Sequence, residues 1–185
     1  KEIRAEKKYN LNLKICSHCY FIRIKKIISR ELMFEEYFYL SSVNESLKNH
    51  FEKLALKIKN KYKKKLFVLD IGSNDGVLLA PLKKNKIKCL GVDPSINVSK
   101  IANKNQLKTL VGFFDFKMTE KILNNFKKPN IIVASSIFTH VENPIQFIKN
   151  VKRILSKDGV FILEIEYVAN FFKNIEFERF YFDRP

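Results

Sequence analysis

The sequence predicts an α/β fold with a doubly wound, mostly parallel sheet, and two features carry this prediction. From Leu66 onward, five short apolar segments alternate with helical segments, and strands separated by helices assemble as parallel βαβ units. The first apolar segment runs into a loop with Gly72 and Gly76, and ligands of such sheets bind beyond the carboxyl ends of the strands. The expected strands span residues 66–71, 88–93, 107–112, 130–136 and 159–167.

The helical segments between these strands have recognisable starts. In the last of them, Asn143 can cap the helix and Pro144 suits its first position, where the missing N–H group has no helical partner in any case. This start places His140 in the loop directly after the fourth strand. The expected helices span residues 76–84, 95–104, 115–126 and 143–156.

The region before the sheet is expected to contain two helices. Ser29 is a candidate N-cap for a helix over residues 29–39. A polar stretch then leads to a longer helix over residues 47–63, which has one apolar face. We therefore expect two domains, with a small module and linker helix in 1–42 and the sheet domain in 43–185. The apolar face of the longer helix consists of Leu47, Phe51, Leu54 and Ile58.

Two of the three cysteines lie close together near the amino terminus. Residues 9–24 alternate in a strand-like pattern around Cys16 and Cys19, which predicts a hairpin or knuckle. Three cysteines, with Cys89 isolated, do not form a disulfide framework, so a reducing compartment is the simpler interpretation.

Composition restricts the class of protein. A chain of 185 residues with 46% hydrophobic residues can bury one ordinary core. It has no run of about eighteen apolar residues and no signal-peptide core, which predicts a soluble, cytoplasmic protein without a membrane partner. The formal charge of +16 raises the hypothesis of nucleic-acid binding. However, the lysines are scattered through helices and linkers, which favours solvated faces; a basic site for a phosphorylated small molecule stays open.

The glycine loop fits neither common phosphate-binding motif. A P-loop needs Gly-x-x-x-x-Gly-Lys, which is missing, and a dinucleotide fingerprint needs glycine where Asn74 stands. A pyrophosphate would also meet the carboxylates of Asp70 and Asp75. A ligand with a cationic end and no phosphate, such as S-adenosylmethionine, suits these acids better.

Two motifs carry a resemblance to class I S-adenosylmethionine-dependent methyltransferases. VLDIGSNDG resembles their first motif and GVDPS their second, whose acid binds the ribose hydroxyls; Asp93 follows Gly72 by 21 residues. The resemblance implies a Rossmann-like sheet. The segment FEEYFYLSS resembles the part of the sugar-nucleotide C-methyltransferase family that closes over the cofactor, and Phe113 is a candidate to flank the adenine. The implied cofactor-binding residues are Asp70, Gly72, Ser73, Asn74, Gly76, Asp93, Pro94, Ser95, Phe113, Ser136, Tyr39 and Ser41.

The chain carries, in this order, CSHC, FEEYFYLSS with His50 downstream, VLDIGSNDGVLL, GVDPS, GFF, IIVASSIFTHVENP and GVFILEIEY. This order, along nearly the whole chain, resembles the sugar-nucleotide C-methyltransferase family. That family has an amino-terminal zinc module with two cysteine pairs and a further carboxyl-terminal domain. Cys16 and Cys19 match the second pair, and a tetrahedral zinc site needs four ligands. The resemblance therefore implies that residues 1–42 are a remnant of the module, that residues 43–185 are a methyltransferase domain ending after its fifth strand, and that zinc belongs to the full-length protein.

The last residues depart from the family pattern. The family segment ends Tyr-His-Glu-His, with the final histidine proposed as the base, whereas this chain reads FERFYFDRP. Tyr181 matches the tyrosine, Asp183 stands for the glutamate, and Arg184 takes the place of the base. Because arginine stays protonated, it suits enolate stabilisation or phosphate binding, and the base would be Asp183, Tyr181 or His140.

The resulting prediction is a monomeric methyltransferase that methylates a carbon of a keto-deoxysugar nucleotide through an enolate. Two other functions are kept as alternatives. One is methyl transfer to an oxygen or nitrogen of another small molecule, and the other is a basic RNA-binding or RNA-modifying protein. A third hypothesis is that a chain ending after the fifth strand is inactive.

Overall fold

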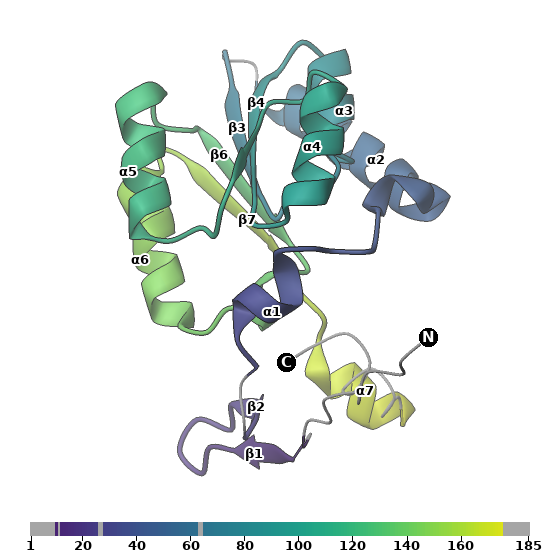
Figure 1. Cartoon of the computed structure of the whole chain (residues 1–185), viewed down its shortest axis with the longest axis vertical. Helices are drawn as coiled ribbons and strands as arrows, with labels where there is room; N and C mark the ends of the chain where they lie inside the picture. Colours follow the sequence, from purple (N-terminus) through teal and green to yellow (C-terminus); the bar gives the residue numbers. More distant parts are fainter. Residues whose placement is uncertain (1–9, 11, 26–27, 63–64, 176–185) are drawn as a thin grey trace, which may run out of the picture. The chain divides into compact units, whose positions relative to one another are not determined.

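The computed structural model describes residues 10, 12–25, 28–62 and 65–175 (Figure 1). They divide into two compact units. The larger is formed by residues 30–166, and the smaller by the described residues of 1–29 and 167–185. The segment 30–42 thus belongs to the same unit as the sheet.

The larger unit is built on a sheet of five parallel strands in the order β5-β4-β3-β6-β7. In the middle of the sheet, Leu69 of β3 lies in register with Leu90 of β4 and Ile132 of β6. This arrangement confirms the predicted fold class. The strands are β3 (Phe67–Ile71), β4 (Lys88–Asp93), β5 (Thr109–Val111), β6 (Ile131–Ser135) and β7 (Val160–Glu164).

Helices cover both faces of this sheet (Figure 1). Because side chains alternate along a strand, β3 contributes Val68 to one face and Leu69 to the other. Val68 packs with Phe51 of α2, whereas Leu69 belongs to the cluster that holds Ile122 of α5 and Phe147 of α6. The helices are α2 (Glu45–Lys61), α3 (Leu79–Lys84), α4 (Ile96–Lys104), α5 (Phe116–Asn125) and α6 (Pro144–Ile154).

The start of α6 is as the sequence predicts. The side chain of Asn143 accepts a hydrogen bond from the Gln146 amide at 3.0 Å, and Pro144 occupies the first turn. His140 ends a short 3₁₀ turn, η2 (Phe138–His140), between β6 and this helix. The predicted start of α6 and the placement of His140 after the fourth strand of the sheet are confirmed.

The helix predicted over residues 29–39 is much shorter in the structure. Helix α1 spans Arg30–Phe34, and the chain then runs without regular structure to a 3₁₀ turn, η1 (Ser41–Val43). The helix stops because the Glu35 carbonyl and the Tyr37 amide bond to Ile96 and Asn97 of the sheet unit. These bonds stand in place of those that would continue the helix.

The smaller unit contains a hairpin and a short helix. Strands β1 (Leu13–Ile15) and β2 (Ile22–Ile24) pair antiparallel, and the turn between them carries Cys16 and Cys19. The predicted hairpin is therefore confirmed. Helix α7 (Val168–Asn174) follows β7 in the chain.

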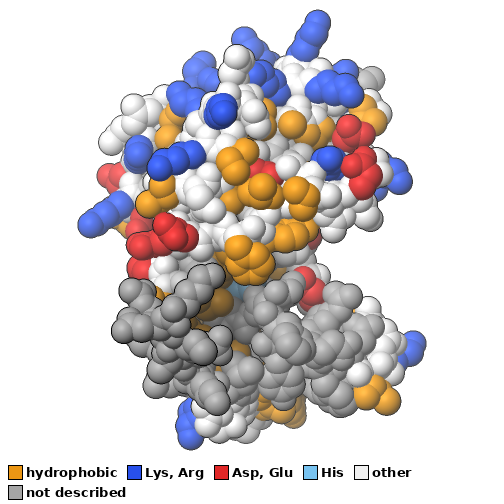
Figure 2. Space-filling view, turned by 45° about the vertical axis from the view of Figure 1, so that its right-hand side comes forward, with side chains coloured by type: hydrophobic (Ala, Val, Ile, Leu, Met, Phe, Trp, Pro, Cys, Tyr) orange, Lys and Arg blue, Asp and Glu red, His pale blue; other side chains and the backbone are white. Residues whose placement is uncertain are grey.

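Charged side chains are spread over the surface. Figure 2 shows Lys and Arg side chains mainly on the upper part of one face, separated by uncharged surface. Within the part of the chain that the structure describes, no helix is long and apolar enough to cross a bilayer.

Candidate active site

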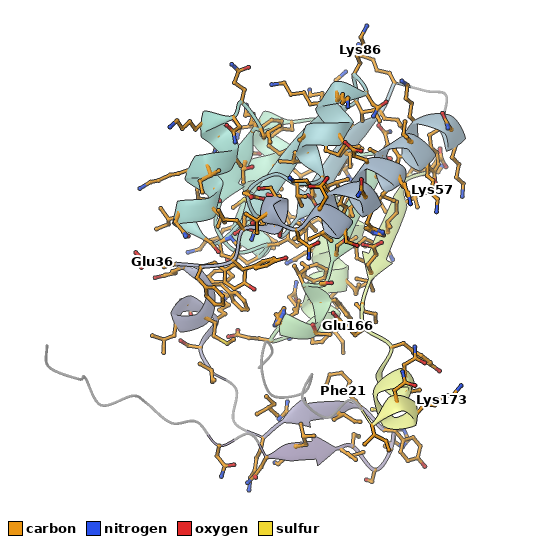
Figure 3. The ribbon with its side chains drawn as sticks, turned by 90° about the vertical axis from the view of Figure 1, so that its right-hand side faces the viewer. Phe21, Glu36, Lys57, Lys86, Glu166 and Lys173 are labelled. Atoms are coloured by element: carbon orange, nitrogen blue, oxygen red, sulfur yellow. The ribbon has the colours of Figure 1, made fainter. Side chains whose placement is uncertain are left out.

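Three carboxyl groups lie at the carboxyl edge of the sheet. Asp70 is the penultimate residue of β3, Asp93 ends β4 and Glu164 ends β7. The two ends of the strands can be followed in Figure 3, where Lys86, just before β4, and Glu166, just beyond β7, lie at opposite ends of the larger unit. Ligands of such sheets bind beyond the carboxyl ends of the strands, so the loops that leave this edge are the candidate binding region.

Asp70 is the most deeply buried of these acids. Burial raises the pKa of its carboxyl well above the ordinary value of 3.8, and the charges of Asp93 and Glu164 raise this pKa further. Since buried carboxylates are stabilised by a nearby positive charge, a cationic group beside Asp70 would oppose this shift.

Asp93 fixes the backbone of the glycine loop. Its Oδ2 accepts a hydrogen bond from the Asn74 amide at 2.8 Å, and its Oδ1 accepts one from the Ser95 amide at 2.9 Å. Burial raises the pKa of Asp93, while these two bonds act in the opposite direction. An ionised carboxylate can accept about four hydrogen bonds, so acceptor positions of Asp93 remain for a ligand.

The glycine loop passes close to strand β4 and to the loop that follows β6. Gly72 has a φ of +76°, which side chains disfavour, and a Cβ atom there would lie 2.3 Å from Cγ2 of Ile137. The amides of Gly72 and Ser73 both donate to the carbonyl of Val92, at 2.8 and 3.2 Å. Glycine is therefore required at position 72 by the backbone and by the space available.

Residues 35–42 form an extended strap across this edge. At its first end, the Ile96 amide at the start of α4 donates to the Glu35 carbonyl at 3.0 Å. The side-chain amide of Asn97 bonds twice with Tyr37: its Oδ1 accepts from the Tyr37 amide at 3.1 Å, and its Nδ2 donates to the Tyr37 carbonyl at 2.6 Å.

The second end of the strap is bound to the glycine loop in the same manner. Oδ1 of Asn74 accepts from the Ser41 amide at 3.0 Å, and Nδ2 of Asn74 donates to the Tyr39 carbonyl at 3.0 Å. Both carboxylate oxygens of Asp75 lie 3.2 Å from the Ser42 amide. The side chains of Asn74 and Asp75, which the sequence suggested would face a ligand, thus hold the strap.

Helix α1 contacts the loops that follow β5 and β6. The guanidinium of Arg30 lies 4.3 Å from the ring centroid of Phe113, and Phe34 makes an edge contact with His140 at 5.3 Å between ring centroids. Arg30 Nε also lies 4.0 Å from an Oε2 atom of Glu142. The structure therefore brings Phe113 and His140, both predicted site residues, under the same short helix.

Sequence reasoning missed one polar cluster on the edge of the sheet. Nε2 of His50, on α2, lies 2.7 Å from Oε1 of Glu164, and the Ser135 hydroxyl donates to Oε2 of Glu164 at 2.6 Å. A signal was present, because His50 lies between Leu47 and Leu54 at helical spacing on the face that meets the sheet.

The remaining predicted residues fall into two groups. Pro94 and Ser95 lie between β4 and α4, the Gly76 amide donates to the Ser73 carbonyl, and the Ser136 amide donates to the Glu164 carbonyl. The structure thus places this first group at the same edge. The second group lies outside the described residues and consists of Tyr181, Asp183 and Arg184.

The predicted metal ligands Cys16 and Cys19 are exposed in the turn of the hairpin. The backbone amide of Cys19, followed by that of His18, lowers the pKa of the Cys16 thiol. Among the residues that the structure describes, no three His, Cys, Asp or Glu side chains are grouped as metal ligands. Two thiols supply half of a tetrahedral zinc site, so zinc binding stays a prediction.

Comparison with known proteins decides the family. The sequence pattern of the methyltransferase domain family matches residues 39–185. The chain belongs to this family. This membership confirms the predicted methyltransferase class, and it covers every residue of the glycine loop.

Two curated methyltransferases illustrate the range of relatives. C-methyltransferase NovU from Streptomyces niveus is 24% identical over 176 residues, which is 94% of this chain and 42% of NovU. The ubiquinone biosynthesis O-methyltransferase of Pelagibacter ubique is 32% identical over 105 residues, 54% of this chain and 42% of that protein. The chain thus spans less than half the length of either relative.

Solved structures support the fold. PH0226 protein from Pyrococcus horikoshii has a TM-score of 0.60 at 20% identity, over 75% of this chain and 66% of that one. The plantazolicin methyltransferase BpumL, in complex with a pentazolic desmethylPZN analog and SAH, has a TM-score of 0.54 at 20% identity, over 69% of this chain and 49% of BpumL. These similarities support the α/β fold of the sheet unit.

Proposed function

We propose that this methyltransferase domain binds S-adenosylmethionine along the carboxyl edge of β3 and β4 and transfers the methyl group to a carbon of a keto-deoxysugar nucleotide. The observation that carries the cofactor assignment is the Asp93 carboxylate. It is buried, fixed by two backbone amides and still able to accept further hydrogen bonds beside the glycine loop.

The charges and shapes at this edge fit the cofactor. Asp93 would accept the ribose hydroxyls, and Gly72 allows the tight turn that brings the loop backbone beside this carboxylate. Asp70 contributes negative charge beyond the ribose, where the cationic methionine end would extend. When bound, the cofactor supplies an electrophilic methyl group on a sulfonium.

The loops and the strap would complete the cofactor site. Phe113 is proposed to flank the adenine, and Tyr39 and Ser41 to contact the cofactor; the bonds of their backbone groups to Asn74 of the glycine loop support this proposal. Ser136 follows β6 on the proposed acceptor side. The proposed cofactor-binding set stays that of the sequence prediction: Asp70, Gly72, Ser73, Asn74, Gly76, Asp93, Pro94, Ser95, Phe113, Ser136, Tyr39 and Ser41.

Similarity to NovU over 94% of the chain supports transfer to carbon, since the O-methyltransferase relative matches only 54%. For a carbon acceptor, a base must remove a proton beside the ketone, and a cation can stabilise the enolate oxygen. Tyr181, Asp183 and His140 stay proposed for proton transfer, and Arg184 for stabilisation of the enolate.

Calorimetry with S-adenosylmethionine tests the cofactor assignment. Removing a charged hydrogen-bond acceptor costs about 1.5–3 kcal/mol, so Asp93→Asn should weaken binding at least tenfold. Asp158→Asn makes the same chemical change at an exposed turn and should bind as the parent does. A parent chain that does not bind the cofactor contradicts the proposal, and a folded Asp93→Asn variant with parental affinity contradicts the site.

The acceptor is tested by incubating the protein with S-adenosylmethionine and a nucleoside-diphosphate 4-keto-6-deoxyhexose. NMR of the product distinguishes a methyl group on carbon from one on oxygen. We expect a carbon-bound methyl group. An oxygen-bound methyl group would replace the proposed acceptor chemistry with that of an O-methyltransferase.

A further inference from the structure

The cluster of Ser135, Glu164 and His50 joins three elements that are distant in the sequence. Oε2 of Glu164 accepts from the Ser135 hydroxyl at 2.6 Å, and Oε1 of Glu164 lies 2.7 Å from Nε2 of His50. Each carboxylate oxygen therefore has its own partner. The glutamate is held from β6 on one side and holds the histidine of α2 on the other.

This arrangement selects one form of the imidazole ring. An ionised carboxylate only accepts hydrogen bonds, so the proton of neutral His50 lies on Nε2. Nδ1 then carries the lone pair and can accept a proton. The ring is also held by an edge contact with buried Phe51, with 5.3 Å between centroids and 65° between planes. A histidine oriented by a carboxylate in this way is a common arrangement for a general base.

The position of the cluster relative to the proposed cofactor site is equally informative. Asp70 lies in register with Val133 of β6, so the two side chains project from the same face of the sheet. Ser135 lies two residues after Val133 and therefore projects from this face as well. Ser135 lies in register with Glu164. The charge of Glu164 also acts on Asp70. The cluster therefore lies beside the acid proposed to face the cationic end of the cofactor, on the side away from Asp93.

We propose that His50, in place of Tyr181, Asp183 or His140, takes the proton from the acceptor carbon, and that Glu164 is its positioning residue. The inference rests on the proposed methyl transfer. The acceptor carbon gives its proton to Nδ1 of His50, its electron pair forms the bond to the methyl carbon, and the pair of the broken S–C bond stays on sulfur. Glu164 stabilises the imidazolium, which returns the proton to water because the His50 side chain is 49% exposed.

A purely structural role for the cluster predicts different behaviour. An exposed histidine–carboxylate pair contributes about 0–1 kcal/mol to stability, so its removal should leave the chain folded. Glu52→Gln, on the exposed side of the same helix, is the matched control. His50→Gln removes the proton acceptor and keeps a side chain of similar size.

The tautomer is measured directly by long-range 1H–15N NMR of the histidine rings in the 185-residue chain, with His50→Gln used for assignment. We expect one neutral tautomer for His50, protonated at Nε2, and a mixture of both tautomers in Glu164→Ala. A ring protonated at Nδ1 in the parent overturns the proposal, because the only lone pair would then face Glu164.

The chemical role is tested by the rate of methyl transfer to the nucleoside-diphosphate 4-keto-6-deoxyhexose. Loss of a general base lowers rates about 10²–10⁴-fold, so His50→Gln should fall by this factor while its calorimetric affinity for S-adenosylmethionine stays within threefold of the parent. Glu52→Gln should retain the parental rate. A His50→Gln rate within threefold of the parent refutes the inference. An inactive parent contradicts the proposed acceptor instead, and the tautomer measurement then decides the inference alone.

Discussion

The strap over the glycine loop should open when Asn74 is replaced by glycine. Asn74 has a φ of +48°, a backbone conformation that glycine adopts without strain. Glycine therefore relieves backbone strain in the folded state but also makes the unfolded chain more flexible, and these two effects roughly cancel. What remains is the loss of three side-chain hydrogen bonds, two of them to Tyr39 and Ser41.

The magnitude follows from these bonds. At about 1 kcal/mol each, the two bonds to the strap contribute about 2 kcal/mol to its closed position. The Ser41 amide should therefore exchange with solvent about thirtyfold faster in Asn74→Gly, as measured by hydrogen–deuterium exchange. All three bonds together should lower the free energy of unfolding by about 2–3 kcal/mol, and the melting temperature by about 5–10 °C.

Asn97→Ala is the matched control, because it removes two hydrogen bonds from the other end of the same strap. It should speed exchange at Tyr37 and leave the Ser41 amide close to the parental rate. Equal exchange of the Ser41 amide in Asn74→Gly and the parent would refute the reasoning, since Asn74 would then not hold the strap.

Three further predictions concern single positions. Gly72→Ala should destabilise the chain by about 2–4 kcal/mol in denaturant unfolding, and by only about 1–2 kcal/mol in an Ile137→Ala background, where the clash is removed but the positive φ stays. Folding raises the pKa of Asp70 above 3.8, so the folded state binds more protons between 3.8 and that pKa, and parental stability falls as pH rises through this window. Asp70→Asn should therefore unfold at a higher temperature than the parent at pH 7, with the difference shrinking toward pH 3. Burial raises the pKa of Cys89 to about 11, while the pKa of exposed Cys16 is lowered, so a thiol reagent at pH 8 should label Cys16 at least tenfold faster, as measured by mass spectrometry of the peptides.

Each of these has an outcome that contradicts it. A Gly72→Ala cost that is the same with and without Ile137→Ala would show that the clash does not contribute. An Asp70→Asn variant less stable than the parent at pH 7 would show that the buried carboxyl is compensated by partners in the folded state. Equal labelling of Cys89 and Cys16 would show that Cys89 is accessible.

Local patterns in the sequence carried the prediction of the sheet and of several helix starts. Apolar segments recur where the strands lie, and Asn143 with Pro144 marks the start of α6, because capping involves residues within one turn. The prediction of a helix over residues 29–39 was wrong in its length for the opposite reason, because contacts distant in the sequence decide where this helix ends. Its local pattern favours a helix, but its backbone from Glu35 onward bonds to Ile96 and Asn97, about sixty residues away.

The sequence by itself determined that acids and glycines gather at one edge of a parallel sheet, since the alternation of strands and helices and the position of each loop follow from short-range patterns. Only the tertiary structure decided what each acid does there. Asp75 was expected to face a ligand, yet it binds the Ser42 amide, and His50 meets Glu164 across 114 residues of chain. No local pattern encodes such pairs, because they depend on how the helices and the strap pack against the finished sheet.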